Sequence, residues 1–454
     1  MADKECPNVR PDPKLAKLVA VVGAGWAGCA AAVELARGGH RVSVFEAART
    51  LGGRARRVEL DGRTLDNGQH ILLGAYGATL RMLKLVGIDA RRALLNLPLQ
   101  MCYPPDSGGM EFIAPRWPAP LHLGAALLRA KGLTGADKLS LARFSSTARW
   151  MGWQLHTDCT VSELLERYDQ TARLIQLMWR PLCLAALNTP PERASANVFL
   201  NVLRDSLGAQ RRASDMLLPR LDLSALFPDA AAALVERHGG QVKTGATVGA
   251  VRRADGGWRV DPVSDTVFDA VVLATPAGTS AALLDALQDP ASAPIHAQLN
   301  ALAPEAISTC YLQYGPHVRL ERAFFALVDT PLAGRWGQFV FDRGQLDASQ
   351  AGLLAVVVSA AADAAAPGQA PLADAIAAQL ATVFQRPELG APLWRQVITD
   401  KRATFACTPG LARPANATGL PGLVLAGDYT ASDYPATIEA AVRSGVLAAA
   451  ALAL

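Results

Sequence analysis

The stretch that decides the fold is Leu18-Val-Ala-Val-Val-Gly23-Ala-Gly25-Trp-Ala-Gly28, close to the N-terminus. Its first five residues are apolar and mostly β-branched, which is typical of a short buried parallel strand. The strand leads directly into a loop with three glycines, and residues 29–37 then predict a helix. A second strand is expected over 41–45, and an acid, Glu46, stands at its end.

Each glycine of this loop has a mechanical role in binding a dinucleotide. Gly23 permits the tight turn, Gly25 lets a pyrophosphate approach the backbone, and Gly28 lets the helix pack closely on the strand. Glu46 is expected to accept hydrogen bonds from an adenosine ribose. A glycine-rich turn alone is common, but here strand, loop, helix, strand and acid follow one another in order. The sequence therefore predicts a Rossmann-type dinucleotide site.

Length and composition narrow the class of protein further. The chain has 454 residues, of which 51% are hydrophobic and 19% charged. One hydrophobic core stops growing at roughly 250–300 residues, so two domains are expected. The mean hydropathy of +0.18 raises the question of a membrane span, which needs about 20 unbroken apolar residues. The longest candidate, 18–36, is interrupted by glycines and by Glu34, so no span is predicted.

Charge, cysteine and histidine patterns exclude several other functions. The formal net charge is +4 and the basic residues are scattered, so nucleic-acid binding is not expected. The seven cysteines include no C-x-x-C pair, which argues against a disulfide framework, a zinc site and a dithiol centre. No histidine spacing suits a metal, so none is predicted. The first 17 residues lack an apolar run, so no signal peptide is predicted and a cytoplasmic location is expected.

Three further segments extend the nucleotide site. Thr50-Leu-Gly52-Gly53-Arg54-Ala55 places a glycine pair and a cation after the ribose acid, which suits a second loop that folds back on the phosphates. Near the C-terminus, a buried strand ends in Gly427-Asp428, and a helix is expected to start around Thr437. The polar run 66–70, Asp-Asn-Gly-Gln-His, fits either a hairpin turn or a cofactor loop on spacing alone.

Together these segments resemble the flavoprotein amine oxidase and phytoene desaturase superfamily, whose members bind FAD. The G-G-R-A run at 52–55 is similar to a signature of that superfamily, and the resemblance runs from Val19 to the C-terminus. It favours a flavin-proximal loop for the polar run 66–70. The cofactor contacts that it implies, beyond the positions already named, are Asn67, Gly68 and Gln69 in this loop, the backbone of Val248 at the adenine, Gly427 and Asp428 at the ribityl and phosphate portion, and the backbone of Thr437 and Ile438 at the pyrimidine end of the flavin.

One branch of the superfamily, the squalene-associated hydroxysqualene dehydroxylases, is similar to this sequence in more detail. The segments that carry this resemblance are 66–76, 179–190, 401–409, 426–430 and 434–441. It implies that reduced FAD donates a hydride to hydroxysqualene, an apolar isoprenoid, and that squalene for hopanoid synthesis is formed. Because no second glycine-rich nucleotide unit follows, an external electron donor is expected. A carotenoid or phytoene-type desaturase, an amine oxidase and an FAD-bearing scaffold remain as alternatives.

The predicted chemistry also requires an acid. An allylic hydroxyl group leaves poorly unless it is protonated while hydride reaches the carbon. The candidates for the acid or its relay are His70 and Asp433, with Lys401 as an electrostatic partner near the flavin. Each has a structural alternative: His70 as a residue that holds a loop, Asp433 as a helix cap, and Lys401 as a solvated cation.

The order of predicted elements indicates an interleaved chain of class α/β. The FAD-binding domain is expected to comprise 1–75, 215–284 and 395–454, with strands that include 247–251. A mixed α+β substrate domain is expected from 76–214 and 285–394, with a helical insert that includes 164–177. The segment 117–133 has two interpretations, a core helix of the insert or a helix on a membrane surface, and the second would give the protein a peripheral membrane contact.

Overall fold

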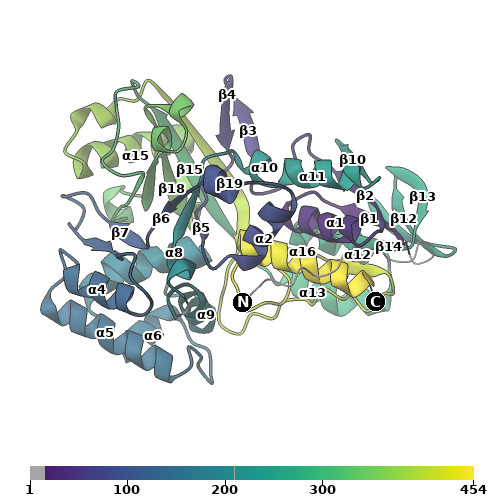
Figure 1. Cartoon of the computed structure of the whole chain (residues 1–454), viewed down its shortest axis with the longest axis horizontal. Coiled ribbons are helices and arrows are strands. Elements are labelled where there is room, and N and C mark those ends of the chain that lie inside the picture. The colour runs from purple at the N-terminus through teal and green to yellow at the C-terminus, as the bar shows by residue number, and fades with distance from the viewer. Residues whose placement is uncertain (1–15, 209, 454) are drawn as a thin grey trace.

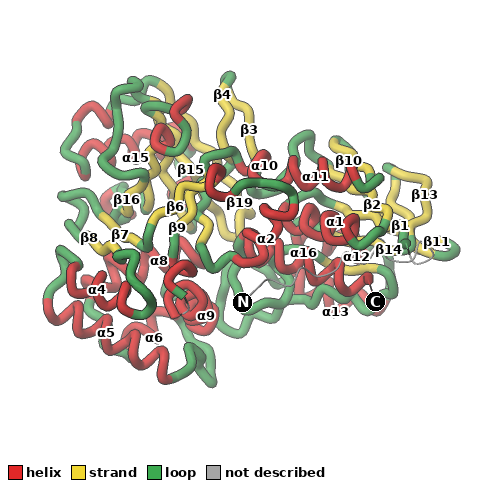
Figure 2. Tube along the Cα trace, viewed as in Figure 1, coloured by secondary structure: helices red, strands yellow, loops and turns green. Residues whose placement is uncertain are grey.

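A parallel sheet and a larger antiparallel sheet lie toward opposite ends of an elongated molecule (Figure 1). The computed structural model describes residues 16–208 and 210–453. Residues 1–15, in which the sequence predicts no signal peptide, lie outside this part of the chain. Helices surround both sheets, and a separate group of helices lies at the lower left of the view (Figure 2).

The parallel sheet is the one that the N-terminal sequence predicts. Its five strands follow the order β10-β2-β1-β14-β20, and every neighbouring pair is parallel. The chain forms it from distant segments: β1 (Leu18–Val22), β2 (Arg41–Glu46), β10 (Gln241–Thr244), β14 (Ala270–Leu273) and β20 (Leu423–Leu425). A Rossmann-type α/β fold is therefore confirmed.

The two faces of this sheet pack against different layers. Val19 and Val21 of β1 join the core formed with the helices α1 (Trp26–Arg37), α11 (Pro228–Arg237) and α16 (Ile438–Ala453). Ala20 and Val22 point to the other face, which is covered by the antiparallel strands β11 (Ala250–Ala254), β12 (Gly257–Asp261) and β13 (Ser264–Phe268). Strand side chains alternate between faces, so the continuous apolar run of β1 buries both sides.

The second sheet is antiparallel throughout and has the order β16-β17-β18-β15-β19. Helix α15 (Gln369–Val383) packs against one face of it. The longest strand, β19, has 12 residues and reaches from this sheet to the nucleotide-binding half. The strands are β15 (Pro304–Gln313), β16 (Phe324–Ala326), β17 (Phe339–Asp342), β18 (Leu353–Ser359) and β19 (Trp394–Phe405).

The helical insert is broken into more pieces than the sequence predicts. The helix expected over 164–177 is instead α6 (Val161–Arg167), α7 (Ala172–Leu174) and a π-helical turn, Ile175–Trp179. The break occurs because Asp169 adopts a positive φ of 48° and Thr171 caps the next helix. The remaining helices of the insert are α4 (Leu121–Arg129), α5 (Gly135–Trp150), α8 (Arg180–Leu187), α9 (Ala196–Leu203) and a second π-helical turn, Arg204–Gly208.

Two further expected boundaries are shifted in the structure. The first helix begins at Trp26 rather than at Cys29, directly after the glycine-rich loop. The strand expected over 247–251 lies at 250–254, which leaves Val248 in a loop. The other described elements are β3 (Arg57–Leu60), β4 (Arg63–Asp66), β5 (Leu72–Leu73), α2 (Gly77–Leu85), α3 (Ala90–Ala93), β6 (Leu94–Leu97), β7 (Gln100–Cys102), β8 (Glu111–Ile113), β9 (Met216–Pro219), α10 (Leu223–Leu226), α12 (Ala277–Asp285), α13 (Ala293–Asn300), α14 (Ala362–Ala365) and 3₁₀ turns at 211–214, 290–292, 331–333, 343–345, 348–350 and 387–390.

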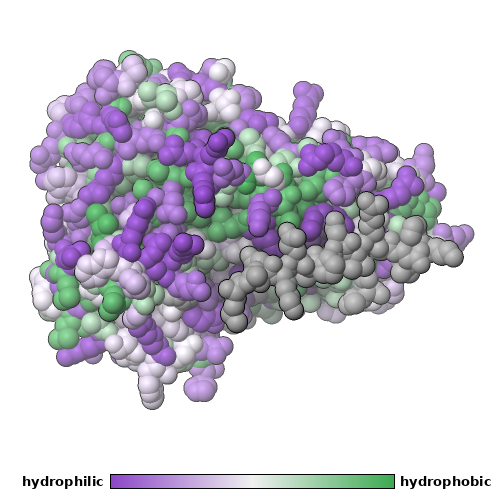
Figure 3. Space-filling view, viewed as in Figure 1, coloured by the Kyte–Doolittle hydropathy of each residue, from purple (hydrophilic) through white to green (hydrophobic). Residues whose placement is uncertain are grey.

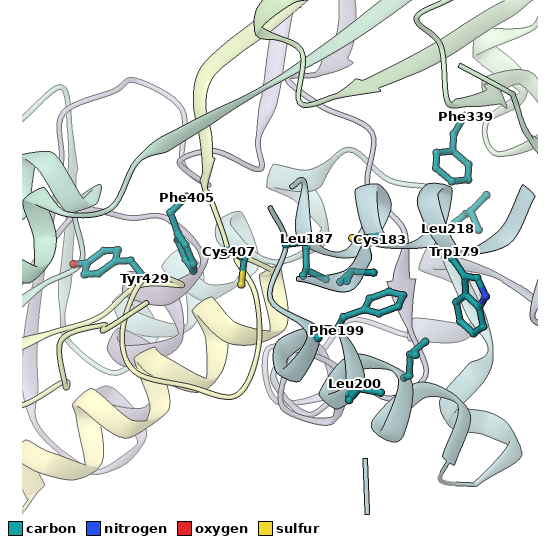
Figure 4. Close-up of a cluster of buried hydrophobic side chains, with 14 of the residues drawn as sticks. Trp179, Cys183, Leu187, Phe199, Leu200, Leu218, Phe339, Phe405, Cys407 and Tyr429 are labelled. Atoms are coloured by element: carbon teal, nitrogen blue, oxygen red, sulfur yellow. The ribbon is translucent and has the colours of Figure 1, made fainter. Parts of the chain in front are cut away.

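A continuous hydrophobic core joins the nucleotide-binding half to the helical insert. Figure 4 shows Phe405 and Cys407 between Tyr429 on one side and Leu187 of α8 on the other. All four side chains are buried. Apolar contacts therefore pack the nucleotide-binding half and the helical insert against each other at this point.

The close packing of α16 on α1 yields a stability prediction. A Cβ atom added at Gly445 would lie 2.2 Å from the carbonyl oxygen of Ala27. Gly445→Ala must push the two helices apart, so we expect a loss of about 3 kcal/mol in the free energy of unfolding. Gly278→Ala on α12 is the control, because an added Cβ meets nothing within 4 Å there. Equal denaturant midpoints for the two variants would contradict this packing.

A buried carboxyl group makes stability depend on pH. Asp66 is 2% exposed, and its Oδ1 atom accepts a hydrogen bond from the backbone N–H of Leu223. Burial raises the pKa of Asp66 to about 6, although the nearby Arg343 opposes the rise. Since the folded-state pKa lies above the unfolded value, ionisation of Asp66 destabilises the fold as pH rises from about 4 to about 6.5, by about 3 kcal/mol in total.

We therefore expect Asp66→Asn to gain stability relative to the unchanged protein across this pH range, because the amide oxygen still accepts from Leu223. Chemical denaturation of both proteins at several pH values measures the difference. A difference that stays constant between pH 4 and pH 7 would show that Asp66 does not titrate in this way.

Candidate functional site

The glycine-rich loop forms a cradle at the carboxyl end of the parallel sheet. Gly23 has a φ of 100°, and a Cβ there would lie 2.6 Å from the carbonyl oxygen of Ala274. An added Cβ at Gly28 would lie 1.9 Å from the carbonyl oxygen of Gly23, so helix α1 contacts the turn directly. At Gly25, by contrast, the nearest atom is 3.9 Å away and belongs to Gly53. The space in front of Gly25 is where a phosphate would approach the backbone.

Glu46 holds this cradle as well as bordering it. Its carboxylate accepts hydrogen bonds from the backbone N–H groups of Ala24, at 2.7 Å, and Ala48, at 2.8 Å. A carboxylate has about four acceptor positions, so two remain for ribose hydroxyl groups. The second glycine loop lies alongside, because the N–H of Gly52 donates to the carbonyl oxygen of Ala24 at 2.9 Å.

Arg54 connects three distant parts of the chain beside this cradle. Its guanidinium forms a 2.5 Å ion pair with Asp428 and donates to the carbonyl oxygen of Ala403 at 2.9 Å. Burial acts to lower the pKa of Arg54, but the carboxylate of Asp428 outweighs it and the pKa is raised. About a third of the side chain stays accessible, and Arg54 lines the nucleotide cavity. The sequence predicts a phosphate partner for this cation, whereas the structure also gives it a protein partner.

Asp66 ends strand β4, and residues 67–70 of the polar run form a loop that lines the cavity, so the alternative interpretation of the run as a hairpin turn is wrong. The hairpin turn lies earlier, at residues 61–62 between β3 and β4. Asn67 donates from Nδ2 to the carbonyl oxygen of Arg54 and accepts at Oδ1 from the N–H of Arg56. These two bonds bind the loop to the second glycine loop.

His70 ends this loop and also lines the cavity. Its Nδ1 atom lies 3.0 Å from the carbonyl oxygen of Gly68, so this nitrogen must carry the proton. Burial lowers the pKa of His70, although the bond to Gly68 opposes the shift. The contact between Nδ1 and Gly68 holds the loop, as the structural alternative for His70 expects.

The remaining predicted cofactor residues lie on the wall of the same cavity, which encloses about 680 Å³. The loop after β10, the end of β20 and the start of α16 contribute to this wall, together with the three loops described above. The predicted residues on the wall are Gly23, Gly25, Glu46, Gly52, Gly53, Arg54, Asn67, Gly68, Gln69, Val248, Gly427, Asp428, Thr437 and Ile438. Gly28 lies behind it, as its predicted packing role requires.

Two of the three predicted catalytic residues lie away from this wall. Lys401 is exposed on β19, and Asp433 is exposed in the loop before α16. Neither side chain lines the nucleotide cavity or the second cavity, which lies next to it between helices of the insert. The structure thus places Lys401 on the surface, as its alternative interpretation expects, and Asp433 at an exposed position outside both cavity walls.

A second cavity of about 730 Å³ adjoins the first and runs between α4, α5, α8 and the π-helical turn 204–208. The two cavities share part of their walls, so they meet. The shared residues are Ile71, Tyr76, Gln100, Met101, Leu182, Ala185, Ala186, Met216 and Thr437. Most of the second wall is formed by leucine, alanine, methionine and aromatic side chains. We refer to it as the apolar cavity.

The acids on the wall of the apolar cavity are already paired. Tyr434 donates a short hydrogen bond to Asp205, and Arg204 donates to the same carboxylate at 2.7 Å. Burial acts to raise the pKa of Asp205, but these two bonds hold it below its ordinary value. Burial and Asp205 together raise the pKa of Tyr434 to about 12. Glu439 accepts from two backbone N–H groups, from Thr79 and from Arg443.

Sequence reasoning missed several wall residues. Tyr76 and Glu439 lie inside segments that carry the family resemblance, but nothing in their spacing marks them as part of a cavity. Asp205 has no signal in the sequence, because its partner Tyr434 is 229 positions away. Among the described residues, no group of three or more His, Cys, Asp or Glu side chains is arranged to hold a metal ion.

Comparisons with known proteins agree with this geometry. A hydroxysqualene dehydroxylase of Rhodopseudomonas palustris is 31% identical, over 96% of this chain and 98% of its own length. One from Sinorhizobium fredii is 29% identical, over 95% and 97%. A 15-cis-phytoene desaturase of an Oncidium hybrid is 25% identical, over 98% of this chain and 79% of its own.

Solved structures share the fold at lower identity. An oxidoreductase of Methanosarcina mazei superimposes with a TM-score of 0.71 at 19% identity and covers 95% of this chain and 99% of its own. Cyclohexylamine oxidase of Brevibacterium oxydans gives 0.67 at 17%, over 96% and 99%. The model of the family named flavin containing amine oxidoreductase matches residues 26–453. The glycine cradle, the cavity behind it and this match have one explanation: the chain belongs to the flavin-containing amine oxidoreductase family, whose cofactor is FAD.

Proposed function

We propose that this protein reductively removes the hydroxyl group of hydroxysqualene and releases squalene for hopanoid or other isoprenoid synthesis. The observation that carries the proposal is the apolar cavity that meets the nucleotide cavity. An oily substrate needs a dry channel with few polar groups, and the acids on this wall are satisfied by their own partners. The similarity to two hydroxysqualene dehydroxylases over nearly their whole length supports the choice of substrate.

The reaction exchanges a carbon–oxygen bond for a carbon–hydrogen bond. A hydride reaches the carbon, a proton reaches the departing oxygen, and the products are a hydrocarbon and water. When bound, reduced FAD supplies the hydride. The chain's own part is to hold the reacting carbon where the two cavities meet, between Tyr76, Leu182 and Thr437, and to keep bulk water away from it.

An external donor must return electrons to the cofactor after each turnover. The described part of the chain contains one parallel nucleotide-binding sheet, so a nicotinamide cofactor has no Rossmann unit of its own there. We therefore propose that a separate reductant reaches the cofactor from outside. His70 is proposed to hold the cofactor loop through Gly68 rather than to act as the acid.

The proposed cofactor contacts predict the effect of changing Glu46. Glu46→Ala removes the ribose acceptor and leaves the N–H groups of Ala24 and Ala48 without their partner. We expect FAD affinity to fall by about 10- to 100-fold, as for loss of a hydrogen bond to a charged group. Glu46→Gln retains the acceptor oxygen and should lose less. Flavin fluorescence titration of the apoprotein measures both, and unchanged affinity in Glu46→Ala would mean that the ribose lies elsewhere.

A carotenoid or phytoene-type desaturase is the second candidate. The similarity to a phytoene desaturase and the apolar cavity both favour it, because its substrate is also a long isoprenoid. The direction of electron flow distinguishes the two functions. A desaturase reduces its flavin with substrate, whereas the proposed enzyme oxidises its reduced flavin with substrate.

Anaerobic photoreduction of the flavin followed by addition of hydroxysqualene tests the proposal. We expect reoxidation of the flavin with one squalene formed for each flavin reoxidised. No reoxidation, together with flavin reduction by phytoene, would assign the protein to the desaturases. Release of hydrogen peroxide with simple amines would assign it to the amine oxidases.

Blocking the junction between the cavities should stop this reaction without removing the cofactor. Ala185 borders both cavities on α8, so Ala185→Trp fills the space through which substrate reaches the cofactor. We expect substrate-dependent reoxidation to slow at least about 100-fold while FAD stays bound, because misplacement of about 1 Å already costs a comparable factor. Ala297→Trp, at an exposed position on α13 outside both cavities, is the control. Equal rates in the two variants would show that substrate takes another route.

A further inference from the structure

Helices α4 and α5 carry large apolar side chains on the outside of the molecule. Leu128 is 78% exposed and Trp150 is 87% exposed, which is unusual for residues of this size. Trp117, Leu121 and Leu139 are also exposed. We call the surface formed by these five residues the α4–α5 face. In Figure 3, green hydrophobic atoms reach the surface at the lower left, where Figure 1 places these helices.

The exposed side chains follow the periodicity of each helix. On α5, Leu139, Arg143, Ser146 and Trp150 are spaced four, three and four residues apart, which brings them onto one side. On α4, the exposed residues Leu121, Gly124 and Leu128 form a second stripe, while His122, Ala125 and Ala126 are buried. Each helix therefore presents a continuous stripe of exposed residues to the outside. Helix α4 has one buried side and one exposed side, so its interpretation as only a core helix is incomplete.

The α4–α5 face surrounds the mouth of the apolar cavity. Trp117, Leu121 and Leu128 are exposed to solvent and also line this cavity. On α5, Ser146 and Arg149 are exposed and line it as well. A molecule that enters between the helices thus passes exposed leucine and tryptophan side chains, with Ser146 and Arg149 beside them, and reaches an apolar interior.

Positive charge dominates this segment. Between residues 114 and 153 there are six basic residues, Arg116, Arg129, Lys131, Lys138, Arg143 and Arg149, and one acid, Asp137. Asp137 is buried and accepts hydrogen bonds from Thr134 and Thr171, so it does not face the surface. The guanidinium of Arg129 lies 4.9 Å from the ring centre of Trp117. Exposed leucines and tryptophans with cations between and beside them are typical of helices that lie in a bilayer interface.

We propose that the α4–α5 face docks on the surface of an anionic lipid bilayer, so that the mouth of the apolar cavity opens against the lipid. The charge favours lipid over a second copy of this chain. In a symmetric dimer the same patch contacts itself, so the exposed cations of one copy, among them Arg143 and Arg149 on α5, would face those of the other. An anionic bilayer supplies both the negative charge for the cations and an apolar layer for the leucines and tryptophans.

Flotation of the holoenzyme with lipid vesicles tests the inference. We expect binding to vesicles of phosphatidylglycerol and phosphatidylcholine, weaker binding to phosphatidylcholine alone, and a loss of binding as salt is raised. Arg143→Gln should weaken binding to the anionic vesicles about fivefold, from about 1 kcal/mol for each basic residue near the surface. Leu139→Glu combined with Trp150→Glu, neither of which lines the cavity, should weaken it at least about tenfold.

The control is Leu393→Glu combined with Leu447→Glu. These leucines are similarly exposed, but they lie before β19 and on α16 rather than on the α4–α5 face. Both double variants replace exposed side chains, so both should fold, retain FAD and keep the melting temperature of the unchanged protein. Equal vesicle binding by the two would overturn the inference. It would also be overturned if the unchanged protein were a dimer in solution that only the α4–α5 variant converts to a monomer.

This inference does not depend on hydroxysqualene being the substrate, and its failure can be distinguished from failure of the proposed function. With substrate dispersed in detergent, the α4–α5 variant should react as fast as the unchanged protein, whereas with substrate inside vesicles it should react more slowly. If no substrate reacts in either assay but the variant still loses vesicle binding, the docking face stands and the proposed reaction does not.

Discussion

The ion pair between Arg54 and Asp428 is the contact on which the site depends. From the loop that carries Gly52 and Gly53, this guanidinium reaches the carbonyl oxygen of Ala403 at the end of β19 and the carboxylate after β20. Asp428 is almost completely buried, so loss of Arg54 would leave an unpaired carboxylate inside the protein. The glycine loops, the long strand from the antiparallel sheet and the C-terminal strand keep their mutual positions through this one side chain.

Around this contact the protein separates two kinds of environment. The nucleotide cavity offers backbone N–H groups, the carboxylate of Glu46 and the start of α16. The apolar cavity offers aliphatic and aromatic side chains, with its acids held by Arg204, Arg443 and nearby hydroxyl groups. A polar cofactor and an oily molecule can therefore be bound side by side, because each is surrounded by groups that satisfy it.

Strong local patterns made much of the fold predictable. The glycine loop, the strands before and after it and a helix within 117–133 were expected from the sequence and are present in the structure. The break between α6 and α7 was not expected, because it depends on a single positive φ at Asp169, a residue type that helices also contain. Local patterns state which residues belong to a segment, but not where its side chains point.

This limit explains the outcome at the site. The predicted cofactor residues belong mostly to loops whose geometry is set by glycines and by sheet ends, so their place on the cavity wall follows from the sequence pattern. Lys401 and Asp433 are adjacent to residues of the cavity wall, such as Asp400 and Tyr434, yet both point to solvent. The pairing of Asp205 with Tyr434 arises only when the helical insert folds against the start of α16.

The order in which the strands of the parallel sheet are synthesised has a consequence for folding. Strand β1 lies at the centre of the sheet and is synthesised before its four neighbours in the sheet, and Asp428 follows its partner Arg54 by 374 residues. At about 5 to 20 residues per second, this delay is about 20 to 80 seconds. During that interval the apolar β1 and the glycine loop have no complete sheet to join, so the nascent chain is exposed to aggregation and to chaperones. The end of β20 and the start of α16 form part of the wall of the nucleotide cavity, so this wall is complete only after these late segments have been synthesised.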